Sequence, residues 1–96
     1  MKRPNDPRAS AREIAEELKD VAQWMSGEGM SPQQFRVAVT LLEKQKLLRY
    51  GLTLSSEISP GPTVHFSLRF ADTGELCASM DVDPETGDAE MQIACT

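Results

Sequence analysis

The last third of the chain alternates apolar and polar residues with the period of a β-strand. The apolar members of its three runs are Val64, Phe66, Leu68 and Phe70, then Leu76, Ala78, Met80 and Val82, and then Ala89, Met91, Ile93 and Cys95. Successive side chains of a strand point to opposite faces of a sheet, so each run has one apolar and one polar face. The pattern predicts three strands that share one apolar face.

Short turns connect these runs and set the register of their pairing. We expect Asp72-Thr73-Gly74 to form a three-residue hairpin loop, because glycine supplies the positive φ angle that such a loop needs. This loop would place Phe70 opposite Leu76 and Phe66 opposite Met80.

The second turn, Pro84-Glu85-Thr86-Gly87, is predicted to be a four-residue loop, because proline suits the start of the turn and glycine its end. It would place Met80 opposite Met91. A slip of one residue would bury Asp88 and Glu90, so the sequence specifies this register strongly.

The N-terminal part of the chain predicts two amphipathic helices. The first would begin with a capping box, in which Ser10 and Glu13 satisfy free backbone groups, and would end near Ser26. Its apolar stripe consists of Ala11, Ile14, Leu18, Val21 and Met25. Trp24 lies beside this stripe, where it would either pack at the rim of the core or serve as an interface anchor.

The second helix would begin at a similar box, formed by Ser31 and Gln34, and would continue to Tyr50. Its apolar positions cover much of the circumference and are Phe35, Val37, Ala38, Val39, Leu41, Leu42 and Leu48. We therefore expect it to be the central helix, in contact with both the sheet and the first helix, with Glu43 on its hydrated side.

Between the helices and the alternating runs, Leu52, Leu54 and Ile58 predict one further strand. The predicted fold is α+β, with two N-terminal helices packed on one face of a four-stranded antiparallel meander (ααββββ). We expect residues 1–9 to be a loosely ordered lead-in and residues 10–96 to form a single domain. The loop lengths leave open whether the first strand pairs with the second or with the last.

The net negative charge of the chain limits the classes of molecule that it can bind. The formal net charge is −5, which argues against nucleic acids and anionic membranes, because both bind through basic surfaces. No apolar run is long enough to span a membrane, and no apolar signal-peptide core follows Met1, so we expect a cytoplasmic protein. Cys77 and Cys95 would point to opposite faces of the sheet and would not form a disulfide, which fits a reducing compartment.

His65 is the only histidine of the chain and the first candidate for chemistry. In the predicted register it faces Asp81, and Glu57 would lie on its other side in a simple meander. A histidine between two carboxylates can act as an acid or a base, and the three residues could instead serve a domain that binds a small ligand or a metal ion. However, no nucleophile must lie beside them, and a flat sheet face has no walls that exclude water. We therefore predict no enzyme, no metal centre and no cofactor.

The hairpin tip from Asp81 to Asp88 resembles the tip that is common in small PepSY-type domains, which inhibit or regulate proteases. The resemblance covers eight of the 96 residues. The secreted or membrane-attached context of that family is missing from this sequence, and we assign no family on this basis.

The remaining hypothesis is a module that binds another protein, as an adaptor, an inhibitor or a regulatory subunit. Small side chains on the predicted outer face of the sheet leave a flat surface that a partner can approach. The last strand would be an edge without the proline, lysine or inward charge that normally keeps an edge from pairing, so a second copy or a strand of another protein could add there. The candidate partner-binding residues are His65, Ser67, Arg69, Cys77, Asp81, Glu90 and Gln92.

Overall fold

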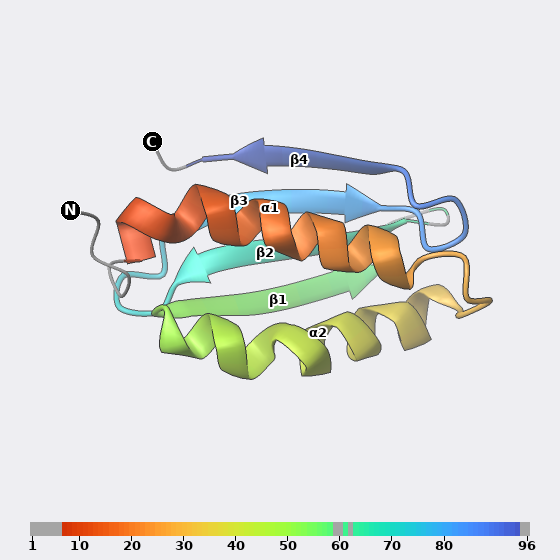
Figure 1. Cartoon of the computed structure of the whole chain (residues 1–96), viewed down its shortest axis with the longest axis horizontal. Helices are drawn as coiled ribbons and strands as arrows, with labels where there is room; N and C mark the ends of the chain where they lie inside the picture. The colour runs from red at the N-terminus through yellow and green to blue at the C-terminus, as the bar shows by residue number, and fades with distance from the viewer. Residues whose placement is uncertain (1–6, 59–60, 62, 95–96) are drawn as a thin grey trace.

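The computed structural model of the chain describes residues 7–58, 61 and 63–94. Its elements are α1 (Pro7–Met25), α2 (Pro32–Arg49), β1 (Leu52–Ile58), β2 (Val64–Phe70), β3 (Leu76–Val82) and β4 (Ala89–Ile93). The strands form one antiparallel sheet in the order β1-β2-β3-β4, and both helices lie on the same face of it (Figure 1). The predicted α+β fold is confirmed, and β1 pairs with β2, as in a simple meander.

Both helices begin at a proline. Proline has no backbone N–H, and the first turn of a helix does not use one for a hydrogen bond within the helix. α1 begins at Pro7, three residues before the predicted cap at Ser10, so the last part of the expected lead-in is helical. α2 begins as predicted. The side chain of Ser31 accepts a hydrogen bond from the backbone N of Gln34 at 3.2 Å, and the Gln34 side chain accepts one from the backbone N of Ser31 at 3.0 Å.

The central part of the predicted register is confirmed. Phe66 pairs with Met80, and Met80 pairs with Met91. Phe66 and Met80 are almost completely buried beneath the helices. On the opposite face of the sheet, His65 pairs with Asp81, as expected.

Cys77 departs from the predicted register. The β2–β3 ladder pairs Leu68 with Ala78 but Arg69 with Leu76, so Cys77 is an extra residue that forms a β-bulge in β3. The bulge turns Cys77 into the core, where it is fully buried, and leaves Leu76 38% exposed. The prediction that Cys77 lies on the outer face of the sheet is wrong.

The length of the β2–β3 loop is the physical cause of the bulge. The backbone N of Phe70 donates to the carbonyl of Glu75 at 3.0 Å, and that of Gly74 donates to the carbonyl of Phe70 at 2.8 Å. These bonds close a loop of residues 71–74, one residue longer than predicted. Phe70 therefore does not face Leu76, and the extra residue in β3 restores the predicted register further along the strand.

The β3–β4 loop has the predicted length and is attached to the end of α1. The backbone N of Gly87, whose φ is +82°, donates to the carbonyl of Asp83 at 2.8 Å. Just after α1, Gly27 donates its backbone N–H to the carbonyl of Pro84 at 2.8 Å, and the Gln23 side chain donates to the carbonyl of Gly87 at 3.0 Å. These two hydrogen bonds fix the position of the hairpin relative to the C-terminal end of α1.

α2 packs on the sheet through one slanted stripe, which consists of the buried residues Phe35, Val39, Glu43 and Leu47. The large apolar residues elsewhere on the helix are exposed: Leu41 by 71%, Leu42 by 54%, Leu48 by 50% and Val37 by 40%. α2 lies along β1 at the margin of the helix layer and has α1 on one side only (Figure 1). The prediction that this helix contacts both the sheet and the first helix is confirmed. The prediction that Glu43 faces water is wrong.

Candidate protein-binding surfaces

The outer face of the sheet, opposite the helices, carries most of the predicted partner-binding residues. Those with exposed or half-buried side chains are His65, Ser67, Arg69, Asp81, Glu90 and Gln92. The ladder brings them side by side, because Asp81 pairs with both His65 and Glu90. Cys77 does not belong to this surface, since the bulge buries it. Cys95 lies outside the described residues, so the expected separation of the two cysteines stays a prediction.

The predicted grouping around His65 is present in the sheet. His65 Nδ1 lies 3.0 Å from Asp81 Oδ1, and Glu57 is the residue of β1 that pairs with His65. The open hollow beside them has a volume of about 240 Å³ and also borders Arg69, whose guanidinium donates to the carbonyl of Gly74 at 3.1 Å. Among the described residues, no group of three or more His, Cys, Asp and Glu side chains is placed to hold a metal ion.

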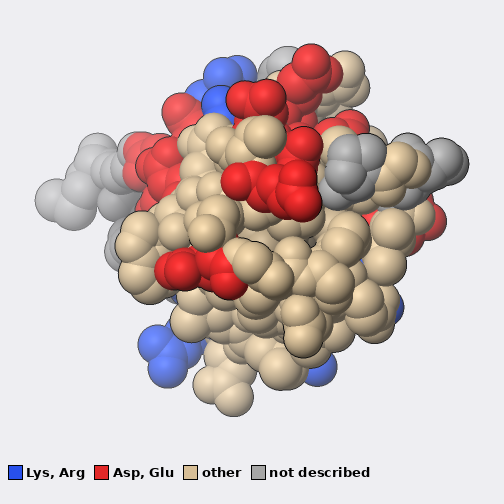
Figure 2. All heavy atoms as spheres, turned by 90° about the vertical axis from the view of Figure 1, so that its right-hand side faces the viewer, with Lys and Arg blue, Asp and Glu red and all other residues tan. Residues whose placement is uncertain are grey.

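Acidic side chains gather at the end of the molecule that holds the β3–β4 hairpin. An open hollow of about 640 Å³ lies there and is lined by Thr63, Asp81, Asp83, Asp88, Ala89 and Glu90. Figure 2 looks at this end and shows acidic groups mainly in its upper part, where some basic groups also lie, whereas the lower part, where α2 lies, is largely uncharged with basic groups at its margin. The acidic side chains at this end therefore lie mainly around the hairpin and away from α2.

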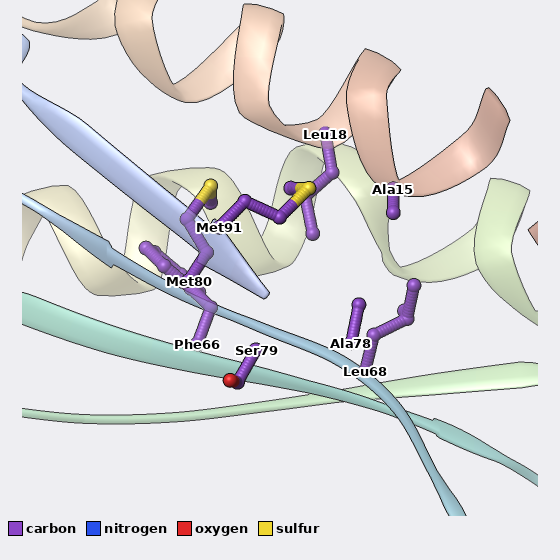
Figure 3. Close-up of a pocket in the computed structure, with 8 residues that line it drawn as sticks. All are labelled: Ala15, Leu18, Phe66, Leu68, Ala78, Ser79, Met80 and Met91. Carbon is purple, nitrogen blue, oxygen red and sulfur yellow. The ribbon is translucent and has the colours of Figure 1, made fainter. Parts of the chain in front are cut away.

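The interior between α1 and the sheet is packed. The gap there is lined by Ala15, Leu18, Phe66, Leu68, Ala78, Ser79, Met80 and Met91 and has no room for a water molecule. Figure 3 shows the side chains of Met80 and Met91 near Leu18 of α1, while the Ser79 hydroxyl points away from the helix. This gap is part of the core, not a ligand site.

β4 is an edge strand whose outward backbone groups can be assigned. The backbone N of Ala94 donates to the carbonyl of Cys77 at 2.8 Å, and the carbonyl of Asp88 accepts a bond from Asp83 at 2.9 Å. Residues of an antiparallel strand bond to their neighbour strand alternately. Even-numbered residues of β4 therefore bond to β3, and Ala89, Met91 and Ile93 present their N–H and C=O groups outward. Figure 1 shows no described element beyond β4.

Two apolar features on the helices complete the surface. Trp24 is 77% exposed, so the prediction that it packs at the rim of the core is wrong, and its role as an interface anchor stays a prediction. The sequence pattern also did not predict that one row of apolar residues on α2 is exposed, because the members of this row have the spacing of core residues. This row, the outer stripe of α2, consists of Val37, Leu41 and Leu48.

No family model, no curated protein and no solved structure matches the chain. Over the described ranges, no helix combines the length and the apolar character needed to cross a lipid bilayer. The functional assignment therefore depends on the geometry of these surfaces.

Proposed function

We propose that the chain is a protein-binding module whose strand β4 pairs with a strand of another chain, and that a second copy is the partner that fits this edge. The observation that carries the proposal is the outward row of N–H and C=O groups on β4, with no described element beyond it. A partner strand would satisfy these groups and extend the sheet. The module would act in the cytoplasm, as an adaptor, an inhibitor or a regulatory subunit.

The sequence of β4 is complementary to itself in one antiparallel register. With Met91 on the two-fold axis, Ala89 of one copy would face Ile93 of the other on the helix side of the sheet. On the outer face, Glu90 would face Gln92 of the other copy, so no like charges would meet. A register centred on Glu90 would instead place two carboxylates directly opposite one another, which is unfavourable.

The helix-facing side of β4 has apolar area that an added strand could cover. The residues of β4 that face the helices, Ala89, Met91 and Ile93, are only half-buried. A second copy would bring its own β4 and α1 beside them, and apolar area that leaves water in this way stabilises the pair.

Charge changes at Gln92 test the proposed register without disturbing the core, because its side chain is exposed. Gln92→Glu would oppose two carboxylates in each of two symmetric pairs, and Gln92→Lys would create two ion pairs with Glu90. Sedimentation equilibrium should show a wild-type dimer that the first change weakens and the second strengthens, each by roughly two- to thirtyfold in dissociation constant. Thr53→Glu, on the exposed face of β1, is the matched control and should leave the dimer unchanged.

Ala89→Pro tests whether backbone hydrogen bonds from β4 contribute to the proposed dimer. Ala89 presents its N–H outward, so proline removes a donor from the free edge and leaves the bonds to β3 intact. The variant should keep its fold by circular dichroism and lose dimerisation. A wild type that stays monomeric at millimolar concentration, or a dimer indifferent to both Gln92 changes, would overturn the pairing of β4 with itself.

A further inference from the structure

The outer stripe of α2 lies on the opposite side of that helix from the residues that anchor it to the sheet. Val37, Leu41 and Leu48 are 40%, 71% and 50% exposed. With Gln34 and Lys44 they follow a three-four-three-four spacing, which is the heptad spacing of a helix that packs on another helix. The row runs from Gln34 to Leu48 and is therefore about 21 Å long at 1.5 Å per residue.

The charge on α2 is opposite to the charge on most of the molecule. Its basic residues are Arg36, Lys44, Lys46 and Arg49, and Lys44 and Arg49 are exposed. Its only acidic residue, Glu43, is buried. The solvent side of α2 is therefore apolar and basic, although the whole chain has a net charge of −5.

These observations distinguish between the occupants that could cover the stripe. A second α2 would bring the basic residues of two copies together, so self-association is disfavoured. A membrane or a nucleic acid is an extended anionic surface that would also face the acidic residues of the rest of the molecule. A single helix of a partner protein, by contrast, would touch α2 and no other part of the molecule. Acidic residues beside the apolar face of that partner helix would meet Lys44 and Arg49.

We infer that the outer stripe of α2 binds an amphipathic helix of a partner protein that carries acidic residues on both sides of its apolar face. This surface is separate from β4 and does not depend on the proposed dimer. Leu41, the most exposed of the three apolar residues, is the central anchor. Lys44 selects acidic partners, because it is exposed and is the residue between Leu41 and Leu48 in the row.

The test uses two fluorescent heptad peptides with leucine at positions a and d, one with glutamate and the other with lysine at positions e and g. Like charges at e and g keep each peptide from pairing with itself. Fluorescence anisotropy with the full chain should show binding of the glutamate peptide, weakening as salt rises, and no binding of the lysine peptide. Leu41→Asp should weaken binding by about tenfold or more, whereas Thr53→Asp on the outer sheet face should not change it.

Charge reversal at Lys44 gives the sharper result. Lys44→Glu should weaken binding of the glutamate peptide and allow binding of the lysine peptide, while circular dichroism shows an unchanged fold. Gln92→Glu should bind like the wild type, which separates this surface from the β4 edge. The inference fails if the glutamate peptide does not bind, if both peptides bind equally, if Leu41→Asp binds normally, or if phosphatidylglycerol vesicles bind and the peptide does not.

Discussion

α1 and α2 lie side by side on the same sheet face but differ in what they present to solvent. The fully or nearly buried residues of α1 are Ala11, Ile14, Ala15, Leu18 and Ala22. Apart from Trp24, every exposed side chain of α1 from Ala11 to Met25 is polar or charged. α2 buries one stripe and exposes a second apolar one. α1 thus buries its only apolar stripe, whereas α2 has a second apolar stripe that is exposed to solvent.

The strongest test of this difference places the same charge on the two faces of α2. Val39→Asp would bury a carboxylate that has no cationic partner there, at a cost on the order of 4 kcal/mol or more, which is enough to unfold a small domain. Leu41→Asp, two residues further on, should change the free energy of unfolding by only about 0.5 kcal/mol, because that side chain is exposed.

Urea denaturation followed by circular dichroism measures both free energies. Leucine is a better helix former than valine, so Leu41→Asp loses more helix propensity than Val39→Asp, and a larger loss of stability at Val39 must come from burial. If Leu41→Asp unfolds the chain as Val39→Asp does, then the outer stripe is part of the core and the contrast between the two helices is lost.

The helices also show what a hydrophobic pattern can and cannot predict. In α1 the apolar spacing defines a single stripe. Its members Ala11, Ile14 and Leu18 are buried, whereas Val21 and Met25 are only half-buried. In α2 the apolar residues lie on two sides, and nothing in their spacing shows which side meets the sheet. The buried stripe even includes Glu43, whose carboxylate lies 3.8 Å from Lys46 Nζ. The choice depends on the position of α2 at the margin of the layer, which is a tertiary property.

The sheet allows a similar distinction for the candidate site. Alternation and turn residues predicted the pairing of His65 with Asp81, because a shifted register would bury charges. The loop lengths left open whether β1 pairs with β2 or with β4, and therefore whether β4 is an edge. They did not predict that Cys77 is buried. The signal that was overlooked is the similarity between residues 71–74 and 84–87, which both end in Thr-Gly and both form four-residue loops. If both loops had been taken to have four residues, β3 would have needed a bulge to keep Phe66 opposite Met80.

A smaller difference between the helices concerns how each begins. Ser31 caps α2 through a reciprocal pair of bonds with Gln34, so Ser31→Ala should lower the free energy of unfolding by about 1 kcal/mol. Ser10 lies inside α1 rather than at its start, so Ser10→Ala should cause no loss, since alanine is the better helix former. Urea midpoints measure both changes. Equal losses would mean that α1 begins at Ser10, as its capping-box sequence predicts.

The smallest effect concerns the ion pair that joins the two helices. Lys46 Nζ lies 2.8 Å from Glu17 Oε1. This hydrogen bond, together with the charge of Glu43, raises the pKa of Lys46 above its ordinary value of 10.5, against the opposing effect of its partial burial. A raised lysine pKa in the folded state stabilises the fold fully below pH 10.5, and the contribution is lost as the pH rises through the folded value.

Glu17→Gln removes this contribution and retains the size of the side chain. Both partners are partly exposed, so solvent screening limits the loss to about 0.2–1 kcal/mol at neutral pH. The difference in unfolding free energy between wild type and variant should shrink as the pH rises above 10.5. Glu16→Gln, on the exposed side of the same helix, is the control for the general effect of charge. A difference that stays constant across this pH range would show that Glu17 acts through packing and not through the charge of Lys46.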